Sequence, residues 1–251
     1  MNEQITNYEY ENKPKNKIKE SLKGNVFLGA TILWFAYAMM IAILAAIIVF
    51  ANANTIGKFF ISRPIIWIVA GIVGFVLLMI TFFMGHRMNF WILLPLVTID
   101  MIFLGTVVLG TALLYALSNF DWLKTFAVFF IPIAVMMLMG TLAVFNIIKL
   151  DKLWVAALII SITLLVLMIV SFFVLNETMY MLYVGLGFIL ICLYMGIDWI
   201  LIIKLNQTYK SDFLTKDTIS EILRISLFYG FKLAYDYIYA VYYLILIFSD
   251  R

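Results

Sequence analysis

Two stretches, LYMGIDWILIIK (residues 193–204) and GFKLAYDYIYAVYYLILIF (residues 230–248), decide the fold. Each belongs to a long apolar segment, and each contains one aspartate, Asp198 in the first and Asp236 in the second. A carboxylate at the centre of a membrane-spanning helix costs about 2.5–3.5 kcal/mol on insertion scales, and such residues usually face a bundle interior or an ion path. The sequence therefore predicts a bundle of helices built around these two acids.

The composition of the chain is that of an integral membrane protein. Of its 251 residues, 66% are hydrophobic and 12% are charged, whereas soluble domains are roughly 45–50% apolar and about 25% charged. One cysteine, Cys192, and one histidine, His86, exclude an intramolecular disulfide and a metal site built from Cys and His. The small net charge of +3 is spread between the apolar segments and does not indicate a nucleic-acid partner. The expected environment is the lipid bilayer.

Seven apolar segments are long enough to cross a bilayer, which requires about 20 residues in a helix. We expect transmembrane helices at residues 26–50, 64–84, 89–117, 122–148, 153–175, 178–205 and 219–248. Short connections make sequential helices antiparallel neighbours. The predicted fold is an all-α, polytopic membrane protein with a polar N-terminal tail (1–25), a single transmembrane domain (26–248) and a short C-terminal tail (249–251).

The distribution of basic residues predicts the orientation in the cell membrane. Twelve of the 17 Lys and Arg residues fall in the N-terminal tail or near the connections that follow the second, fourth and sixth helices, and four fall on the other side. Because basic residues are enriched in cytoplasmic loops, we expect a cytoplasmic N-terminus. With seven helices, the C-terminus then lies outside.

The seventh predicted helix, residues 219–248, is expected to be the central one. It is rich in tyrosine: Tyr229, Tyr235, Tyr237, Tyr239, Tyr242 and Tyr243. Tyrosines near a helix end usually lie at the membrane interface, but several of these are too deep for that. Their hydroxyl groups need hydrogen-bond partners inside a protein core, which favours a helix surrounded by the others.

Four ionisable residues lie too deep in the predicted helices to be placed in a loop: Asp100, Asp198, Lys232 and Asp236. At the rise of an α-helix, Asp198 lies about 9 Å and Asp236 about 18 Å from the cytoplasmic ends of their helices. Two carboxylates that meet in a low dielectric cannot both ionise at low cost, so they share a proton or hold a cation. The pair predicts a pH-sensitive, di-aspartyl gate on a cation path.

Lys232 and Asp100 leave alternatives open. Lys232 precedes Asp236 by four residues and lies on the same helical face. The two residues therefore form a silent internal ion pair, or Lys232 is a tethered counter-ion that holds the path closed. Asp100 is either an auxiliary third member of the acid cluster or a polar position next to a kink at Pro95.

No enzymatic chemistry is expected. The chain has no glycine-rich phosphate loop, no HExxH helix and no Ser-His-Asp set that its single histidine could complete. An intramembrane aspartyl protease would also use two aspartates on adjacent helices. However, Gly196-Ile197-Asp198 lacks the GxGD pattern of that class, and only Tyr235-Asp236 matches its YD context.

The residues around both acids resemble the Bax inhibitor (TMBIM) family of seven-helix membrane proteins. The segment LYMGID (residues 193–198) resembles the sixth-helix pattern LYxxYD, and LAYDYI (residues 233–238) resembles the seventh-helix pattern LYLDFIN. Weaker likenesses are LGT at residues 104–106 and LMGTL at residues 138–142.

The resemblance implies six helices around a central seventh and a non-enzymatic, proton-sensitive calcium leak through Asp198 and Asp236. Calcium is then the permeant ion, with Asp198 and Asp236 as its candidate ligands, and no cofactor is implied. Arg87 is the base nearest to the position where bacterial members carry an arginine at the end of helix two, which makes it a candidate auxiliary residue. Lys232 stands where a small or polar residue is usual, and its positive charge opposes a divalent ion.

Two function hypotheses follow. The first is a pH-sensitive cation leak channel, with calcium as the expected ion, gated by Asp198 and Asp236. The alternative is an integral membrane protein that conducts no ion and modulates a partner in the membrane, such as a membrane protease or a stress-response protein. In that case the buried polar cluster only fixes the register of the helices.

Overall fold

The structure is a computed structural model that describes residues 25–55, 62, 64–171, 177–211 and 216–249. These residues form helices and contain no strand, so the all-α prediction is confirmed for them. The elements are α2 (Val26–Ala51), α4 (Pro64–Met84), α5 (Phe90–Leu104), η1 (Gly105–Leu109), α6 (Gly110–Asn119), α7 (Trp122–Val144), α8 (Leu150–Ser171), α9 (Glu177–Ser211) and α10 (Lys216–Ser249). Most of the predicted tails, and residues 172–175 of the fifth predicted helix, lie outside the described residues.

Six helical segments of the described chain are long and apolar enough to cross a membrane. They are Val26–Ala51, Phe90–Asn119, Trp122–Val144, Leu150–Ser171, Glu177–Tyr209 and Ile219–Ser249. Helix α4 contributes a shorter apolar segment, Ile68–Met84. These lengths and compositions indicate a multi-pass membrane protein, while the count of seven spanning helices stays a prediction.

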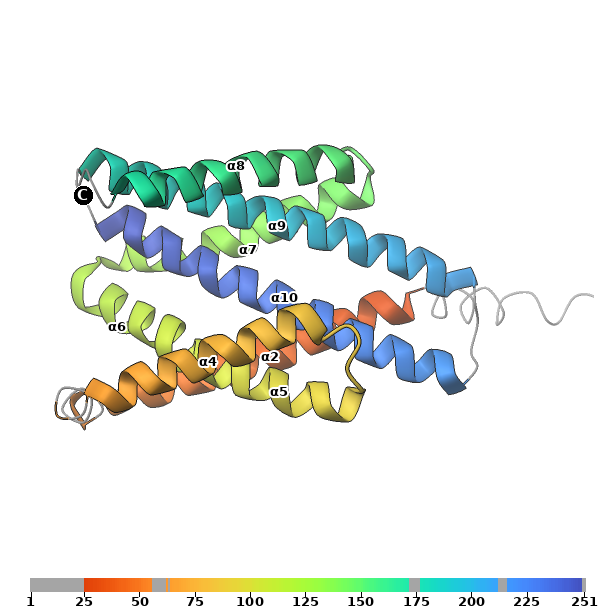
Figure 1. Ribbon diagram of the computed structural model, residues 1–251, viewed down its shortest axis with the longest axis horizontal. Helices are drawn as coiled ribbons and strands as arrows, with labels where there is room; N and C mark the ends of the chain where they lie inside the picture. The colour runs from red at the N-terminus through yellow and green to blue at the C-terminus, as the bar shows by residue number, and fades with distance from the viewer. Residues whose placement is uncertain (1–24, 56–61, 63, 172–176, 212–215, 250–251) are drawn as a thin grey trace, which may run out of the picture.

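The helices lie roughly along one long axis; α5 and α6 continue in one direction through η1, and otherwise neighbours in sequence run in opposite directions (Figure 1). Helix α2 begins at the right end of the view, where α4 connects to α5 and α7 to α8, and α10 ends at the left. Helices α9 and α10 reach further to the right than their neighbours. They have 35 and 34 residues, so each is about 50 Å long. Helix α9 ends at Ser211 and therefore continues past its predicted end at residue 205.

Tertiary contacts explain why α9 extends beyond its apolar run. The Oδ1 atom of Asn206 accepts a hydrogen bond of 3.2 Å from the backbone N–H of Leu28. The ring of Tyr209 stacks on Phe27, with 5.3 Å between the ring centroids. The polar end of α9 is therefore held against the start of α2 by specific contacts that apolar length alone does not indicate.

Helix α10 is the most enclosed of the candidate spans. Its apolar window is 56% buried, against 11% for α8. It packs against α2, α5, η1, α6, α7 and α9. The hydroxyl of Tyr237 donates a 3.1 Å hydrogen bond to the carbonyl oxygen of Phe129 in α7, which confirms that a deep tyrosine of this helix finds its partner inside the protein.

A π-helical turn, η1, joins α5 to α6, and it was not predicted. Helix α5 runs without interruption through Pro95, and the irregularity instead lies at residues 105–109, where the N–H of Gly110 bonds to the carbonyl of Gly105. A π turn takes one residue more than an α turn. The additional residue keeps Leu104 and Leu109, five positions apart, buried on the same side.

Helix α2 approaches its neighbours most closely at two glycines. A Cβ atom added to Gly105 would lie 2.4 Å from the carbonyl oxygen of Ala42 in α2. One added to Gly230 of α10 would lie 2.7 Å from the backbone nitrogen of Phe35. Real Cβ atoms do not come this close, so the absence of side chains at these positions is what lets the three helices meet.

Candidate functional site

Both predicted acids line a single pocket between α4, α8, α9 and α10. Asp198 comes from α9, and Lys232 and Asp236 come from α10. The pocket has a volume of about 470 Å³. Apolar and aromatic side chains complete the lining, among them Phe82 from α4 and Trp154 from α8. The antiparallel contact of α9 with α10 therefore brings together three of the ionisable residues that the sequence singled out.

The two carboxyl groups are withdrawn from solvent. Asp198 is 1% exposed and Asp236 is 4% exposed. In each of them the Oδ2 atom is buried without a hydrogen-bond partner among the described residues. Buried polar atoms without partners are costly, so both side chains hold unused capacity to accept a proton or to bind a cation.

Lys232 is ion-paired across the helix interface. Its Nζ donates to Oδ1 of Asp198 in α9, and the ammonium also lies 5.8 Å from the centroid of the Tyr229 ring. The sequence left open an ion pair between Lys232 and Asp236, because four residues separate them on one helical face. The structure keeps both side chains at the same pocket but gives the ion pair to Asp198, because α9 presents that carboxylate to the lysine.

Aromatic side chains form one wall of the pocket. The ring of Phe82 in α4 meets Tyr235 of α10 edge to face, with 4.7 Å between centroids, and it also contacts Phe231. Tyr235 in turn lies 4.4 Å from Tyr239, centroid to centroid. The contact between the end of α4 and α10 is thus made by rings, and it lies directly beside the acids.

Asp100 and Arg87, the two auxiliary candidates, lie away from this pocket. Asp100 is fully buried in α5, where one carboxylate oxygen accepts a hydrogen bond from the Thr81 hydroxyl of α4 and the other has no hydrogen-bond partner in the part of the chain that the structure describes. Arg87 is exposed in the connection between α4 and α5 and lines a second, polar pocket. The structure therefore brings Asp198, Lys232 and Asp236 together and leaves Asp100 and Arg87 apart from them.

Replacing Thr81 by Val is expected to destabilise the protein by about 1–3 kcal/mol, because it leaves the buried Asp100 carboxyl without its side-chain partner. The free energy of unfolding, measured by titration with SDS in mixed micelles, checks this. Thr111→Val is the matched control, because that exposed hydroxyl bonds only to carbonyls of its own helix. The double variant Thr81→Val, Asp100→Leu should recover most of the loss, and equal stability of the two single Thr variants would contradict the prediction.

Two contacts between α9 and α10 were not predicted, because each depends on the register between the two helices. One is the Lys232–Asp198 pair, and the other is a hydrogen bond between Tyr209 of α9 and Glu221 of α10. In the part of the chain that the structure describes, no group of three or more His, Cys, Asp or Glu residues is placed to hold a metal ion.

No protein-family model matches the chain, and no curated protein matches it either. The likeness to the Bax inhibitor family therefore remains a prediction that rests on the residues around Asp198 and Asp236.

Proposed function

We propose that the chain is a pH-sensitive cation leak channel of the Bax inhibitor type, with calcium as the expected ion. The observation that carries this proposal is that Asp198 and Asp236, buried on adjacent antiparallel helices, line one pocket and each keep an unpartnered carboxylate oxygen. Two such groups in a low dielectric share a proton or hold a cation. Protonation and cation binding therefore compete for the same oxygen atoms.

Lys232 acts in this proposal as the tethered counter-ion of the closed state. Its ammonium occupies Asp198, so a cation can reach both carboxylates only after that ion pair separates. Protons and Lys232 then both control how often the acids are free. The ordinary ligand set of calcium is six to eight oxygens, so water must supply the rest of its coordination during passage.

The proposed architecture places this site in the cell membrane, in a bundle of seven spanning helices with α10 in the centre. In support, α4 has 21 residues, a length of about 31 Å at the α-helical rise, close to the roughly 30 Å of a bilayer core. The contacts of α10 with four other spans, namely α2, α5–η1–α6, α7 and α9, support its central position. The excess of basic residues on one side supports a cytoplasmic N-terminus and an outside C-terminus.

Calcium flux into proteoliposomes is expected to fall when either Asp198→Asn or Asp236→Asn is introduced. Loss of one ionised ligand should reduce flux roughly tenfold, the factor that corresponds to about 1.4 kcal/mol of cation binding. The pH dependence of the flux should also disappear in the double variant. Asp121→Asn is the matched control, because Asp121 caps α7 at the surface and Asn caps helices equally well. Wild-type flux that is insensitive to pH and to both substitutions would refute the channel.

The second candidate function is that of a non-transporting protein that modulates an integral membrane partner. The Lys232–Asp198 pair favours it, because an internal ion pair can fix the register of two helices without any transport. Helix α8 offers the most exposed apolar surface for such a partner, with its span 11% buried. A partner that co-purifies with the wild type, and is lost on changing Leu158 and Ile162 but not the aspartates, would support this function.

A further inference from the structure

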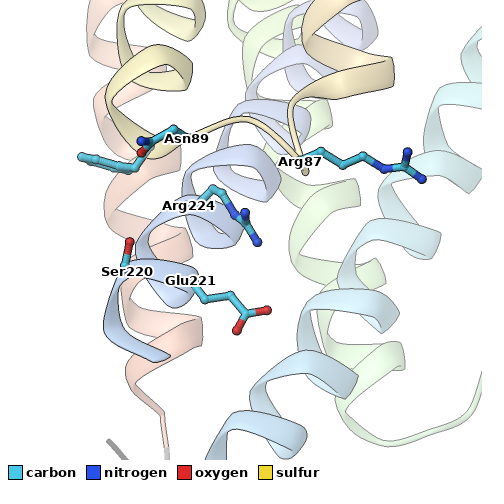
Figure 2. A pocket seen from close by; sticks show the side chains of 6 residues that line it. Arg87, Asn89, Ser220, Glu221 and Arg224 are labelled. Carbon is cyan, nitrogen blue, oxygen red and sulfur yellow. The ribbon is translucent and has the colours of Figure 1, made fainter. Parts of the chain in front are cut away.

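A second pocket lies at the end of the bundle where α4 connects to α5, and it is polar. Its volume is about 420 Å³, and its lining comes from the α4–α5 connection and from the early turns of α10: Arg87, Asn89, Phe90, Ser220, Glu221 and Arg224. Figure 2 shows Arg224 and Glu221 extending in the same direction from α10, with Arg87 reaching out from the connection above them. The pocket takes no part in the acid site, since the two share no lining residue.

One basic group of this pocket has an unmet need for an oxygen acceptor. The Nε atom of Arg224 is buried and has no hydrogen-bond partner among the described residues. The Nε–H of Arg87 lies in an exposed position and donates to His86 at 3.1 Å. The lining combines two guanidinium groups with one carboxylate, so the pocket carries a net positive charge. Guanidinium pairs of this kind are suited to bind phosphate oxygens.

Glu221 provides an acceptor beside the two arginines. It already forms a hydrogen bond with Tyr209 of α9, which orients its carboxylate, and it lines the pocket next to Arg224. A ligand that places a hydrogen-bond donor beside a phosphate would therefore satisfy both signs of charge at once. A bare phosphate would meet the arginines but would also face this carboxylate.

The surroundings of the pocket are those of the membrane surface. Trp91, next to the lining residue Phe90, is 76% exposed, and exposed tryptophans at the ends of apolar helices typically lie at the headgroup level. Ile92 and Ile219 lie close in sequence to the lining residues Phe90 and Ser220, and both are exposed apolar residues. Hydrocarbon chains can lie on these side chains while a polar group occupies the pocket.

We propose that this pocket binds the headgroup of a phospholipid, with the phosphodiester oxygens held by Arg87 and Arg224. Glu221 accepts a hydrogen bond from an ammonium or hydroxyl group on the same headgroup. Phosphatidylethanolamine and phosphatidylglycerol carry such a donor next to the phosphate. Phosphatidylcholine does not, because its nitrogen is fully methylated, so the pocket discriminates against it. This site is independent of the proposed ion conduction.

The test measures lipid retention by native mass spectrometry of the full chain, released from nanodiscs that contain equal amounts of the three phospholipids. The wild type is expected to retain phosphatidylethanolamine and phosphatidylglycerol over phosphatidylcholine. Arg224→Gln should weaken the retained binding roughly tenfold, which corresponds to about 1.4 kcal/mol. Arg87→Gln, at an exposed position that leaves the fold intact, should act in the same direction. Glu221→Gln should reduce the discrimination against phosphatidylcholine.

Lys204→Gln is the matched control, because Lys204 is an exposed base of α9 outside this pocket. It should retain lipid as the wild type does. Retention that is equal for all three lipids, or that falls as much with Lys204→Gln as with Arg87→Gln, would overturn the proposal. A parallel thermal melt with inorganic phosphate distinguishes the two sources of phosphate: stabilisation by phosphate as large as that by lipid would assign the pocket to a free anion instead.

Discussion

Replacing Lys232 by Met is expected to destabilise the protein by about 3–5 kcal/mol, the usual cost of leaving one member of a buried ion pair alone. The reason is that Asp198, which is 1% exposed, loses the ammonium of Lys232, while its second oxygen already lacks a hydrogen-bond partner among the described residues. The free energy of unfolding in mixed micelles measures this. The destabilisation should shrink as the pH is lowered, because a protonated Asp198 no longer needs a counter-ion.

A double variant tests whether this loss of stability comes from the ion pair. Removing both charges, in Lys232→Met with Asp198→Asn, is expected to recover most of the lost stability, since replacing a whole buried pair is often neutral. The Lys204→Met variant, at an exposed base of the same helical pair, should change stability by less than about 0.5 kcal/mol. A double variant as unstable as Lys232→Met would show that the loss does not come from leaving the Asp198 carboxylate without its counter-ion.

Gly105→Ala is expected to weaken the contact between α2 and the η1 turn by about 1–3 kcal/mol or more. The added methyl would lie 2.4 Å from the carbonyl oxygen and 2.7 Å from the Cα of Ala42. Both of these are backbone atoms, so no side-chain rotation relieves the clash and the helices must separate. The same unfolding titration and the fraction of protein extracted as a monodisperse species measure the effect.

Two further variants test the cause of this effect. Gly185→Ala should be tolerated, because a methyl there meets no atom within 4 Å. Ala42→Gly combined with Gly105→Ala should bring no rescue, because the obstructing atoms belong to the backbone of residue 42. A recovery in that double variant would mean that the side chain of Ala42, and not the helix itself, limits the approach.

The helices could be predicted from the sequence because their apolar length is a local property. The starts of α2, α4 and α7 coincide with the predicted ones. The extension of α9 to Ser211 was missed, since it depends on the contact of Tyr209 with Phe27, which joins segments far apart in the chain. The π turn was also missed, because nothing in the composition of residues 105–109 distinguishes it from an ordinary turn of an apolar helix.

The candidate site shows the same division between local and tertiary information. The spacing of four residues placed Lys232 and Asp236 on one face correctly, and both line the pocket. The choice of Asp198 as the lysine's partner depends on the register between α9 and α10, which a single sequence does not define. The polar pocket with Arg87 and Arg224 was missed for a related reason, since it exists only where a connection and a helix start meet.

The wide turn between α5 and α6 makes this segment tolerant of one particular deletion. Loss of one codon within residues 105–109 would convert this turn to a regular α turn and leave the helix after it facing the same way, because residues four apart share a face in an α-helix as residues five apart do in a π turn. Leu109 and Ala112, now buried, would stay directed to the interior. A homologue that is one residue shorter here can therefore keep its inward-facing positions along all of α6.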